Sequence, residues 1–298
     1  MKLKVVTAII VVTTLFFLGD ILARELSKHQ EIERSIIKKY RKSIWNAFIG
    51  AVQEYELIKE GDCIAVCISG GKDSMILAKC MELLKRHSEV NFDIKYIVMD
   101  PGYAQPNREL IEQNLKTLGI DAEIFVSDIF DVAFNAGGSP CYLCARMRRG
   151  ALYGKAQSIG CNKIALGHHL DDAIETTLMS MIYSSEIKTM LPKLHSTNFE
   201  GMELIRPLYK VKERDIISWA NYNDLHFLRC ACKFTADSAE DEMLSKRQEM
   251  KELVKSLRLK NPDADDNIFR SLHNVNMATM PGWRDSDSGE KHSFIEKY

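Results

Sequence analysis

The chain lacks an excess of charge of either sign, because its 298 residues include 40 Lys and Arg against 41 Asp and Glu. Any contact with nucleic acid must therefore come from local basic patches. The chain also lacks internal repeats and the dense disulfide framework of a small secreted domain, since its 8 cysteines are scattered. With 46% apolar and 27% charged residues, it has the composition of a soluble globular protein of one large domain or two small ones.

The Walker phosphate loop, G-x-x-x-x-G-K-S/T, is missing as well. In its place, the apolar residues 63–68, which predict a buried strand, are followed by Ser69, Gly70, Gly71, Lys72, Asp73 and Ser74. The glycines let backbone N–H groups converge on one point, at the N-terminus of a helix predicted over residues 75–85. Lys72 adds a positive charge, and Asp73 can hold Mg²⁺. The segment is a candidate phosphate loop; the alternative, a simple glycine turn, does not require this Lys-Asp-Ser order.

A second candidate segment consists of Gly167, His168, His169, Leu170, Asp171 and Asp172. The glycine allows close approach of the backbone, and the acids stand at the start of a predicted helix. Carboxylates beside a polyphosphate are best explained if they hold Mg²⁺ or orient a nucleotide. Helix capping by Asp171 or Asp172 is the alternative.

The order of elements predicts an α/β fold, a parallel sheet with helices on both faces and helical extensions at both ends. Strands are predicted over residues 63–68, 94–99, 122–126, 163–166 and 204–205, and helices over residues 31–55, 75–85, 108–118, 151–159, 174–183, 211–222 and 237–257. Ligands bind beyond the carboxyl ends of such strands, where the phosphate loop, Asp100 and Gly167 all fall. We expect an apolar N-terminal segment (1–25), a basic amphipathic helix region (26–60), the α/β domain (61–236), a helical region (237–280) and a flexible tail (281–298).

Two cysteine pairs are candidate metal ligands. Cys141 and Cys144 form a C-x-x-C at the start of a helix, and Cys230 and Cys232 form a C-x-C near the end of the α/β domain. Such pairs chelate a metal or a cluster, or act in redox chemistry. Three thiolates suit a 4Fe-4S cluster with one open iron and four suit zinc, so both alternatives stay open. The other cysteines are expected to be small core residues: Cys63, Cys67, Cys80 and Cys161.

Basic side chains gather at two places. Arg146, Arg148 and Arg149 follow the C-x-x-C, where they either grip phosphates of ATP or RNA or form a surface charge run. The helix predicted over residues 31–55 has a basic face, for which solvated surface and nucleic-acid contact are both open. The candidates for RNA contact on this face are Lys38, Lys39 and Arg41.

Taken in order, S-G-G-K-D-S, C-x-x-C-x-R-x-R-R-G, G-H-H-x-D-D, R-P-L and a late cysteine pair resemble the PP-loop ATP pyrophosphatases. Within that superfamily they resemble the tRNA 2-thiocytidine synthetases, over about residues 31–277. The resemblance implies that ATP adenylates the C2 oxygen of cytidine 32 in the tRNA anticodon loop, with loss of pyrophosphate. Sulfur delivered by an iron–sulfur cluster then replaces AMP.

The resemblance also implies roles for the motifs. The amides of Gly70 and Gly71, with Lys72 and Ser74, would hold pyrophosphate. Asp73, with Asp172, would position Mg²⁺. Cys141, Cys144 and one of Cys230 or Cys232 would ligate the cluster, whose open iron would carry the sulfide. The catalytic set implied is Lys72, Asp73, Cys141 and Cys144, and the nucleotide-binding set adds Ser69, Asp100, Gly167, His168 and Asp171.

Two features depart from the family pattern: the late cysteines form C-x-C instead of C-x-x-C, and an apolar segment precedes the first helix. One alternative function is a PP-loop ligase or 2-thiouridine synthetase whose cysteines bind zinc. Another is a membrane-tethered ATP-binding protein without catalysis, against which the intact Lys72-Asp73 pair argues. The partners implied are tRNA and a sulfur donor such as a cysteine desulfurase, and a homodimer is an open alternative.

The apolar N-terminal segment follows Lys2 and Lys4 and covers residues 5–18, which is below the about 20 residues that span a bilayer. Charge followed by a short apolar run is typical of a signal peptide or a short anchor. No small-x-small cleavage site follows, and export does not suit an enzyme that uses cytosolic ATP. An anchor, a packed helix and a misassigned start stay open. We expect a cytoplasmic enzyme, free or tethered to the inner face of the membrane through residues 1–23.

Overall fold

The computed structural model describes residues 26–127, 140–228, 242–285 and 288–297, with only the backbone at 140–146, 242–245 and 297. The chain divides into two compact units. The larger unit comprises Met1–Ala173 and Met190–Lys246, and the smaller unit comprises Ile174–Thr189 and Arg247–Tyr298.

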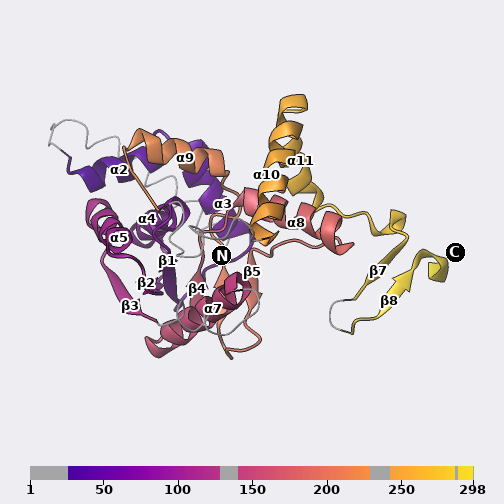
Figure 1. The fold of residues 1–298 in the computed structure, drawn as a ribbon, viewed down its shortest axis with the longest axis horizontal. Coiled ribbons are helices and arrows are strands. Elements are labelled where there is room, and N and C mark those ends of the chain that lie inside the picture. Colours follow the sequence, from indigo (N-terminus) through magenta and orange to yellow (C-terminus); the bar gives the residue numbers. More distant parts are fainter. Residues whose placement is uncertain (1–25, 128–139, 229–241, 286–287, 298) are drawn as a thin grey trace. The chain divides into compact units, whose positions relative to one another are not determined.

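The larger unit is built on a six-stranded sheet with the order β3-β2-β1-β4-β6-β5 (Figure 1). Its strands are β1 (Cys63–Ile68), β2 (Asp93–Asp100), β3 (Ala122–Val126), β4 (Lys163–Ala165), β5 (Lys193–His195) and β6 (Glu203–Ile205). All neighbours are parallel except β5, which pairs antiparallel to β6 at the sheet edge. The predicted parallel α/β sheet is therefore confirmed, and β5 is an addition that its three residues were too short to reveal.

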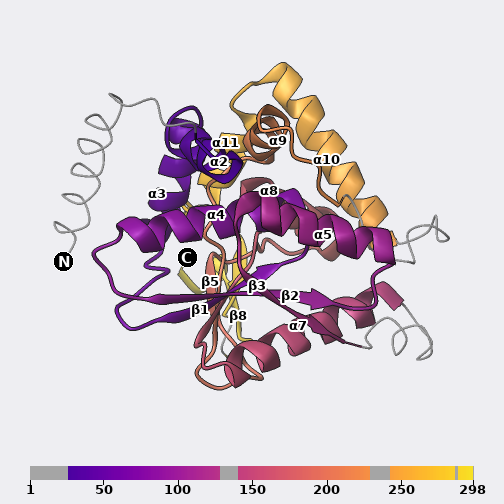
Figure 2. The same ribbon diagram turned by 90° about the vertical axis from the view of Figure 1, so that its left-hand side faces the viewer.

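Helices cover both faces of this sheet, as predicted. Figure 2 shows α4 and α5 along one face and α7 along the opposite face. The helices of this unit include α2 (Lys28–Ile37), α3 (Asn46–Glu54), α4 (Lys72–His87), α5 (Gln105–Leu118), α7 (Pro140–Ser158) and α9 (Glu213–Tyr222). Because α4 starts at Lys72, three residues before the predicted start, the Lys-Asp-Ser segment forms its first turn.

The single helix predicted over residues 31–55 is interrupted. A π-helix, Arg41–Trp45, separates α2 from α3, with Tyr40 in a non-helical conformation before it. At this break, the Tyr40 hydroxyl donates to the backbone oxygen of Ser218 in α9 (2.8 Å). The apolar faces of α2 and α3 belong to the same buried cluster as the apolar residues of α4.

A charged network lies within this core. The fully buried ammonium of Lys79 is 2.8 Å from a carboxylate oxygen of Glu33, whose second oxygen is 2.8 Å from the Arg86 guanidinium. Burial raises the pKa of Glu33, but its hydrogen bonds to these two cations outweigh burial and lower the pKa to about 2. The network therefore ties α2 to α4 by charge as well as by apolar contact.

The smaller unit contains most of α8 (Leu170–Ser184) and of α10 (Glu242–Lys260), together with α11 (Ala264–Ser271). Arg258 of α10 pairs with the fully buried Asp265 of α11 at 3.0 Å. The region predicted as a flexible tail forms a hairpin of β7 (Gly282–Arg284) and β8 (Lys291–Ser293), on which Trp283 stacks on His292. Among the described residues, no helix has the length and apolar character needed to cross a membrane, and the apolar residues 5–18 lie outside them.

Candidate functional site

Three chain segments meet where β1, β4 and β6 end. The parallel register places Val66 beside Ala165 and Ala165 beside Ile205, so their carboxyl ends share one edge. A Cβ on Gly167 would lie 2.9 Å from the carbonyl carbon of Asp73 and 3.0 Å from the backbone N of Ser74. Only glycine fits there. The two sequence motifs are therefore in backbone contact, as their positions after parallel strands predicted.

The phosphate loop is closed by hydrogen bonds around Ser74. Its Oγ accepts from the backbone N of Ser69 (3.1 Å) and donates to the backbone O of Gly71 (2.9 Å). Gly70 has φ +84°, a conformation that favours glycine. The loop opens directly into the N-terminus of α4, where free N–H groups and the helix dipole favour an anion.

Lys72 is held between two carboxylates. Its Nζ lies 3.1 Å from Asp73 and 2.9 Å from Glu213, the first residue of α9. Burial lowers the pKa of Lys72, but the two carboxylates outweigh burial and raise the pKa overall. No motif in the sequence marks Glu213, because it reaches the site only through the packing of α9.

Asp73 keeps one oxygen for a further contact. Its buried Oδ1 has no hydrogen-bond partner among the described residues, and His169 Nε2 lies 3.8 Å away. Burial raises the pKa of the Asp73 carboxyl, and the charges of His169 and Lys72 only partly offset this effect. A buried carboxylate oxygen without a hydrogen-bond partner is suited to bind a cation.

The two acids of the second motif make capping contacts. Asp172 Oδ2 accepts from the backbone N of His169 (2.9 Å) at the start of α8. Asp171 Oδ2 accepts from the backbone N of Glu213 (2.7 Å) at the start of α9. Each of these two contacts caps a helix, because it pairs a backbone N–H group at the start of α8 or α9. Through that bond, Asp171 also positions the residue that holds Lys72.

Asp100 lies at the predicted edge but is engaged within the protein. Its Oδ1 accepts from the backbone N of Gly102 (2.9 Å) and of Tyr103 (2.8 Å), and its Oδ2 accepts from Arg108 (2.7 Å). Burial raises the pKa of Asp100, but these bonds outweigh it and lower the pKa overall. Its contacts shape the loop that carries Tyr103.

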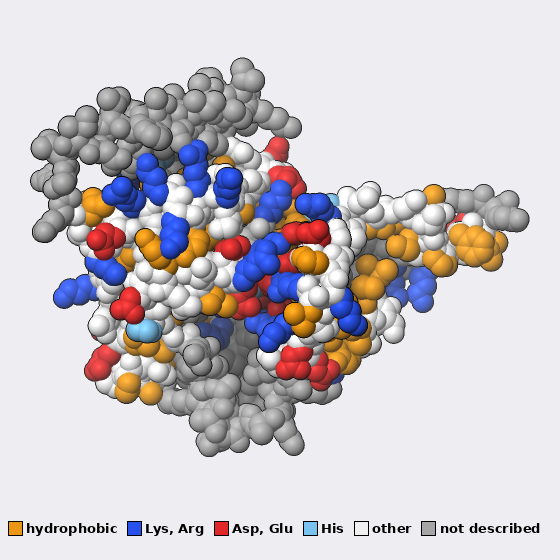
Figure 3. Space-filling view, turned by 90° about the horizontal axis from the view of Figure 1, so that it is seen from above, with side chains coloured by type: hydrophobic (Ala, Val, Ile, Leu, Met, Phe, Trp, Pro, Cys, Tyr) orange, Lys and Arg blue, Asp and Glu red, His pale blue; other side chains and the backbone are white. Residues whose placement is uncertain are grey.

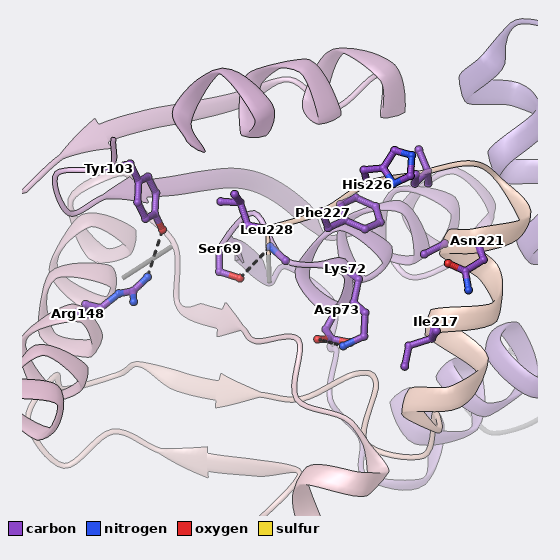
Figure 4. A pocket seen from close by; sticks show the side chains of 13 residues that line it. Ser69, Lys72, Asp73, Tyr103, Arg148, Ile217, Asn221, His226, Phe227 and Leu228 are labelled. Carbon is purple, nitrogen blue, oxygen red and sulfur yellow. Dashed lines mark hydrogen bonds and ion pairs between the residues drawn. The ribbon is translucent and has the colours of Figure 1, made fainter. Parts of the chain in front are cut away.

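A pocket of about 630 Å³ opens beside the phosphate loop (Figure 4). Arg148 of α7 donates to the Tyr103 hydroxyl (3.4 Å) on one side, and the Leu228 N donates to the Gly70 O (3.3 Å) on another. The sequence predicted the loop residues and Arg148, but not the contributions of α9 and of the segment after it. The lining comprises Ser69, Gly71, Lys72, Asp73, Tyr103, Arg148, Ile217, Ala220, Asn221, Leu225, His226, Phe227 and Leu228.

The side chains of the four cysteines that were predicted to bind a cluster lie outside the part of the chain that the structure describes. Cys141 and Cys144 lie in the first turns of α7, which confirms the predicted helix start after the glycine-rich loop, but their side chains are not described, nor is that of Arg146. Cys230 and Cys232 lie in residues 229–241, outside the described part. Of the four predicted core cysteines, Cys67, Cys80 and Cys161 are buried and Cys63 is half-buried.

The remaining basic candidates lie on the surface of the larger unit. Lys38 and Lys39 are exposed just after α2, and Arg41 is exposed as the first residue of the π-helix. The Lys39 ammonium lies 3.4 Å from the centre of the Tyr222 ring, and that ring is 55% exposed at the end of α9. Figure 3 views the side of this unit that carries α2 and α9, where many Lys and Arg side chains gather. A basic surface with an accessible aromatic ring suits an RNA partner.

Comparison with known proteins adds sequence evidence. The PP-loop domain family matches residues 34–241. The tRNA-cytidine(32) 2-sulfurtransferase of Geobacter metallireducens is 39% identical over 241 residues, which cover 80% of this chain and 91% of the relative. The enzyme of the same name from Methylobacillus flagellatus is 36% identical over 242 residues, with 80% and 77% covered.

A solved structure matches the fold. The U34-tRNA thiolase NcsA from Methanococcus maripaludis, determined with its 4Fe-4S cluster, superposes with a TM-score of 0.60 at 21% identity. The match covers 83% of this chain and 78% of that one. At this identity the match bears on the fold alone, and it agrees with the parallel sheet described above.

Proposed function

Because the chain belongs to the tRNA-cytidine(32) 2-sulfurtransferase family of PP-loop proteins, we propose that it converts a tRNA cytidine to 2-thiocytidine at the expense of ATP. The observation that carries this proposal is the pocket beside the phosphate loop. Lys72 and Asp73 line this pocket together with Arg148, which lies one turn beyond the C-x-x-C, and Leu228, which lies two residues before Cys230. An activating group and a sulfur-delivering group would thus face one cavity.

The phosphate loop is proposed to bind the phosphates of ATP. When bound, ATP would supply the AMP group that turns the C2 oxygen of cytidine into a leaving group. The N–H groups of Gly70 and Gly71 and the Lys72 ammonium would neutralise the departing pyrophosphate. Lys72 already lies between two carboxylates, so its charge is held at the loop before a nucleotide arrives.

Asp73 is proposed to hold Mg²⁺, with Asp172 as the second acid. The fit rests on the buried Asp73 Oδ1, which lacks a hydrogen-bond partner among the described residues. Burial raises the pKa of Asp73 and the charge of Asp172 adds to this effect; a bound cation would relieve the repulsion between the two acids. Mg²⁺ there would neutralise charge that develops at the α-phosphorus.

Cys141, Cys144 and one of Cys230 or Cys232 are proposed to ligate a 4Fe-4S cluster. The support is the donor set: three thiolates leave one iron of such a cluster open, and that iron would hold the sulfide that the sulfur donor provides. The thiolase NcsA, which shares the fold, contains a cluster of this type. Zinc bound by all four cysteines is the outcome that would exclude this assignment.

The tRNA is proposed to bind across the basic surface formed by Lys38, Lys39 and Arg41, with Arg146, Arg148 and Arg149 nearer the pocket. Nucleotide phosphates are well matched to such guanidinium and ammonium groups. A cysteine desulfurase is the expected sulfur donor, and the cytoplasm is the expected location. A homodimer and a membrane tether through residues 1–23 remain proposals for gel filtration and for fractionation to decide.

The test is reconstitution of the full chain under anaerobic conditions. With ATP, Mg²⁺, sulfide and unmodified tRNA, nucleoside mass spectrometry should detect 2-thiocytidine, and metal analysis should find about four irons per chain. Lys72→Met should abolish the product. Lys116→Met, an exposed lysine on α5 away from the pocket, is the matched control and should retain it. A product of 2-thiouridine, or stoichiometric zinc without iron, would contradict the proposal.

A further inference from the structure

Arg206 emerges at the same sheet edge as the phosphate loop, but nothing above gives it a role. It directly follows β6, and the backbone N of Leu166 donates to the Ile205 O (3.0 Å), which aligns β6 with the strand that leads to Gly167. The backbone N of Arg206 donates to the Pro192 O (2.9 Å). The side chain therefore starts from a fixed point beside the second motif.

The side chain of Arg206 is half-buried, and its Nε is shielded from solvent. One terminal nitrogen donates to the Leu191 backbone oxygen, but the buried Nε has no hydrogen-bond partner among the described residues. Within the same described part, no carboxylate lies at salt-bridge distance from Arg206. Burial lowers the pKa of Arg206 to about 10; Tyr209, Tyr153 and Asp172 oppose this effect, and the charge of Arg149 adds to it. A charged donor buried in this way is costly unless an anion completes it.

A second guanidinium lies within electrostatic range. Arg149 is exposed on α7, one turn before Tyr153 and on the same helix face. Tyr153 is buried, and its ring stacks on that of Phe199, just before β6, with centroids 5.0 Å apart. Burial raises the pKa of Tyr153, whereas the charges of Arg149 and Arg206 both lower it. One helix and one strand end thus bring two positive groups within electrostatic range of the same buried tyrosine.

We propose that Arg206 and Arg149 form a phosphate-binding site, separate from the phosphate loop, at the carboxyl end of β6. A guanidinium fork matches the oxygens of a phosphate, and a partly buried fork with an unused N–H binds more tightly than a fully solvated one. The phosphate comes from one of two sources: the α-phosphate of the nucleotide, or a backbone phosphate of the RNA next to the reacting cytidine. The identity of these ligands rests on the proposed function, whereas the presence of an anion site does not.

The test measures two affinities of the full-length protein: that for ATP with Mg²⁺, and that for an anticodon stem-loop RNA at several salt concentrations. Arg206→Gln should weaken one of the two by at least about tenfold, and Arg206→Lys should recover part of the loss. A loss confined to ATP assigns the α-phosphate. A loss confined to RNA, with a salt slope reduced by about one, assigns the RNA backbone.

Arg149→Gln is the second variant, because Arg206 also holds the Leu191 backbone and its replacement can affect folding. As an exposed residue, Arg149 can be changed without a packing loss, and its variant should weaken the same ligand by at least about threefold. Arg270→Gln, an exposed arginine of α11, is the matched control and should bind both ligands like the wild type. The inference is overturned if Arg149→Gln and folded Arg206 variants bind both ligands within twofold of the wild type.

These binding assays require no thiolation. If affinity falls but no thiolated product is ever formed, the proposed function fails and the phosphate site stands. If thiolation occurs and both affinities are unchanged, only the phosphate site fails.

Discussion

Replacing Gly167 by alanine would place a methyl carbon against the backbone of the first turn of α4. The new Cβ would lie 2.9 Å from the carbonyl carbon of Asp73, whereas ordinary contact begins at 3.4 Å. One of the two segments must therefore move by about half an ångström. The atoms in the way belong to the backbone of the turn that carries Lys72 and Asp73, so no side chain can rotate to absorb the change.

Two effects follow, and they have different magnitudes. Overpacking of this kind costs about 1–3 kcal/mol, which lowers the melting temperature by about 2–4 °C per kcal/mol in a chain of this size. A displacement of about 1 Å in an active site costs about a hundredfold in rate, so half that distance should cost about tenfold. We expect Gly167→Ala to lose activity by more than its modest loss of stability explains.

The assay pairs thermal unfolding with the initial rate of tRNA thiolation at saturating ATP. Gly50→Ala is the matched control: this glycine lies inside α3, and nothing lies within 4 Å of a Cβ built there. It should be neutral or stabilised by about 0.4–1 kcal/mol, with full activity. The reasoning is refuted if Gly167→Ala melts and reacts like the wild type, because the two motifs would then not be in backbone contact.

Three further predictions address charge. Asp73→Asn should abolish activity yet raise the free energy of unfolding at neutral pH. The pKa of Asp73 is higher in the folded than in the unfolded chain, so its ionised carboxylate destabilises the fold above that pKa. Urea unfolding of the wild type and the variant at pH 4 and pH 7 should show the difference growing with pH, and an equal difference at both would contradict it. Glu33→Gln should cost about 2–3 kcal/mol at neutral pH, since its folded pKa of about 2 lies below the ordinary glutamate pKa of about 4.5. That stability is present above about pH 4.5 and is lost as the pH falls toward 2, so a penalty that persisted at pH 2 would count against the ion-pair network. Tyr222→Ala should weaken tRNA binding by a few-fold while the affinity for ATP stays constant, because its exposed ring contacts Lys39 and does not line the pocket at the phosphate loop. Fluorescence anisotropy with labelled tRNA measures this change. An unchanged tRNA affinity would show that this end of α9 does not contact the RNA.

Much of the fold followed from the sequence because the β-branched runs and helical spacing are strong local signals. All five parallel strands lie where they were predicted, and the strand ends carry the two motifs to one edge. The exceptions have local causes. The break after α2 lies where Tyr40 bonds to Ser218, a partner far along the chain, and the hairpin of β7 and β8 arises in a segment whose polar composition indicated a tail.

The site was predictable only where motifs mark it. The phosphate loop, Asp73 and Arg148 reach the pocket as the sequence indicated. Glu213 and Phe227 were missed because they belong to segments without a motif and enter the site through tertiary packing alone. The sequence marked Arg206 only as part of R-P-L. Its buried Nε without a hydrogen-bond partner among the described residues depends on tertiary packing and cannot be read from the sequence. The cysteine assignments stay predictions, because those side chains lie outside the described part of the chain.

The central claim is that ATP activates the C2 oxygen of the target cytidine, which then leaves with AMP as sulfur takes its place. An anticodon stem-loop labelled with ¹⁸O at C2 of that cytidine tests this directly when it is incubated with the full protein, ATP, Mg²⁺ and sulfide. Mass spectrometry should find the label in the phosphate of AMP, in equal amount to the 2-thiocytidine formed. Unlabelled AMP, with the ¹⁸O retained in the RNA or released to water, would contradict the account.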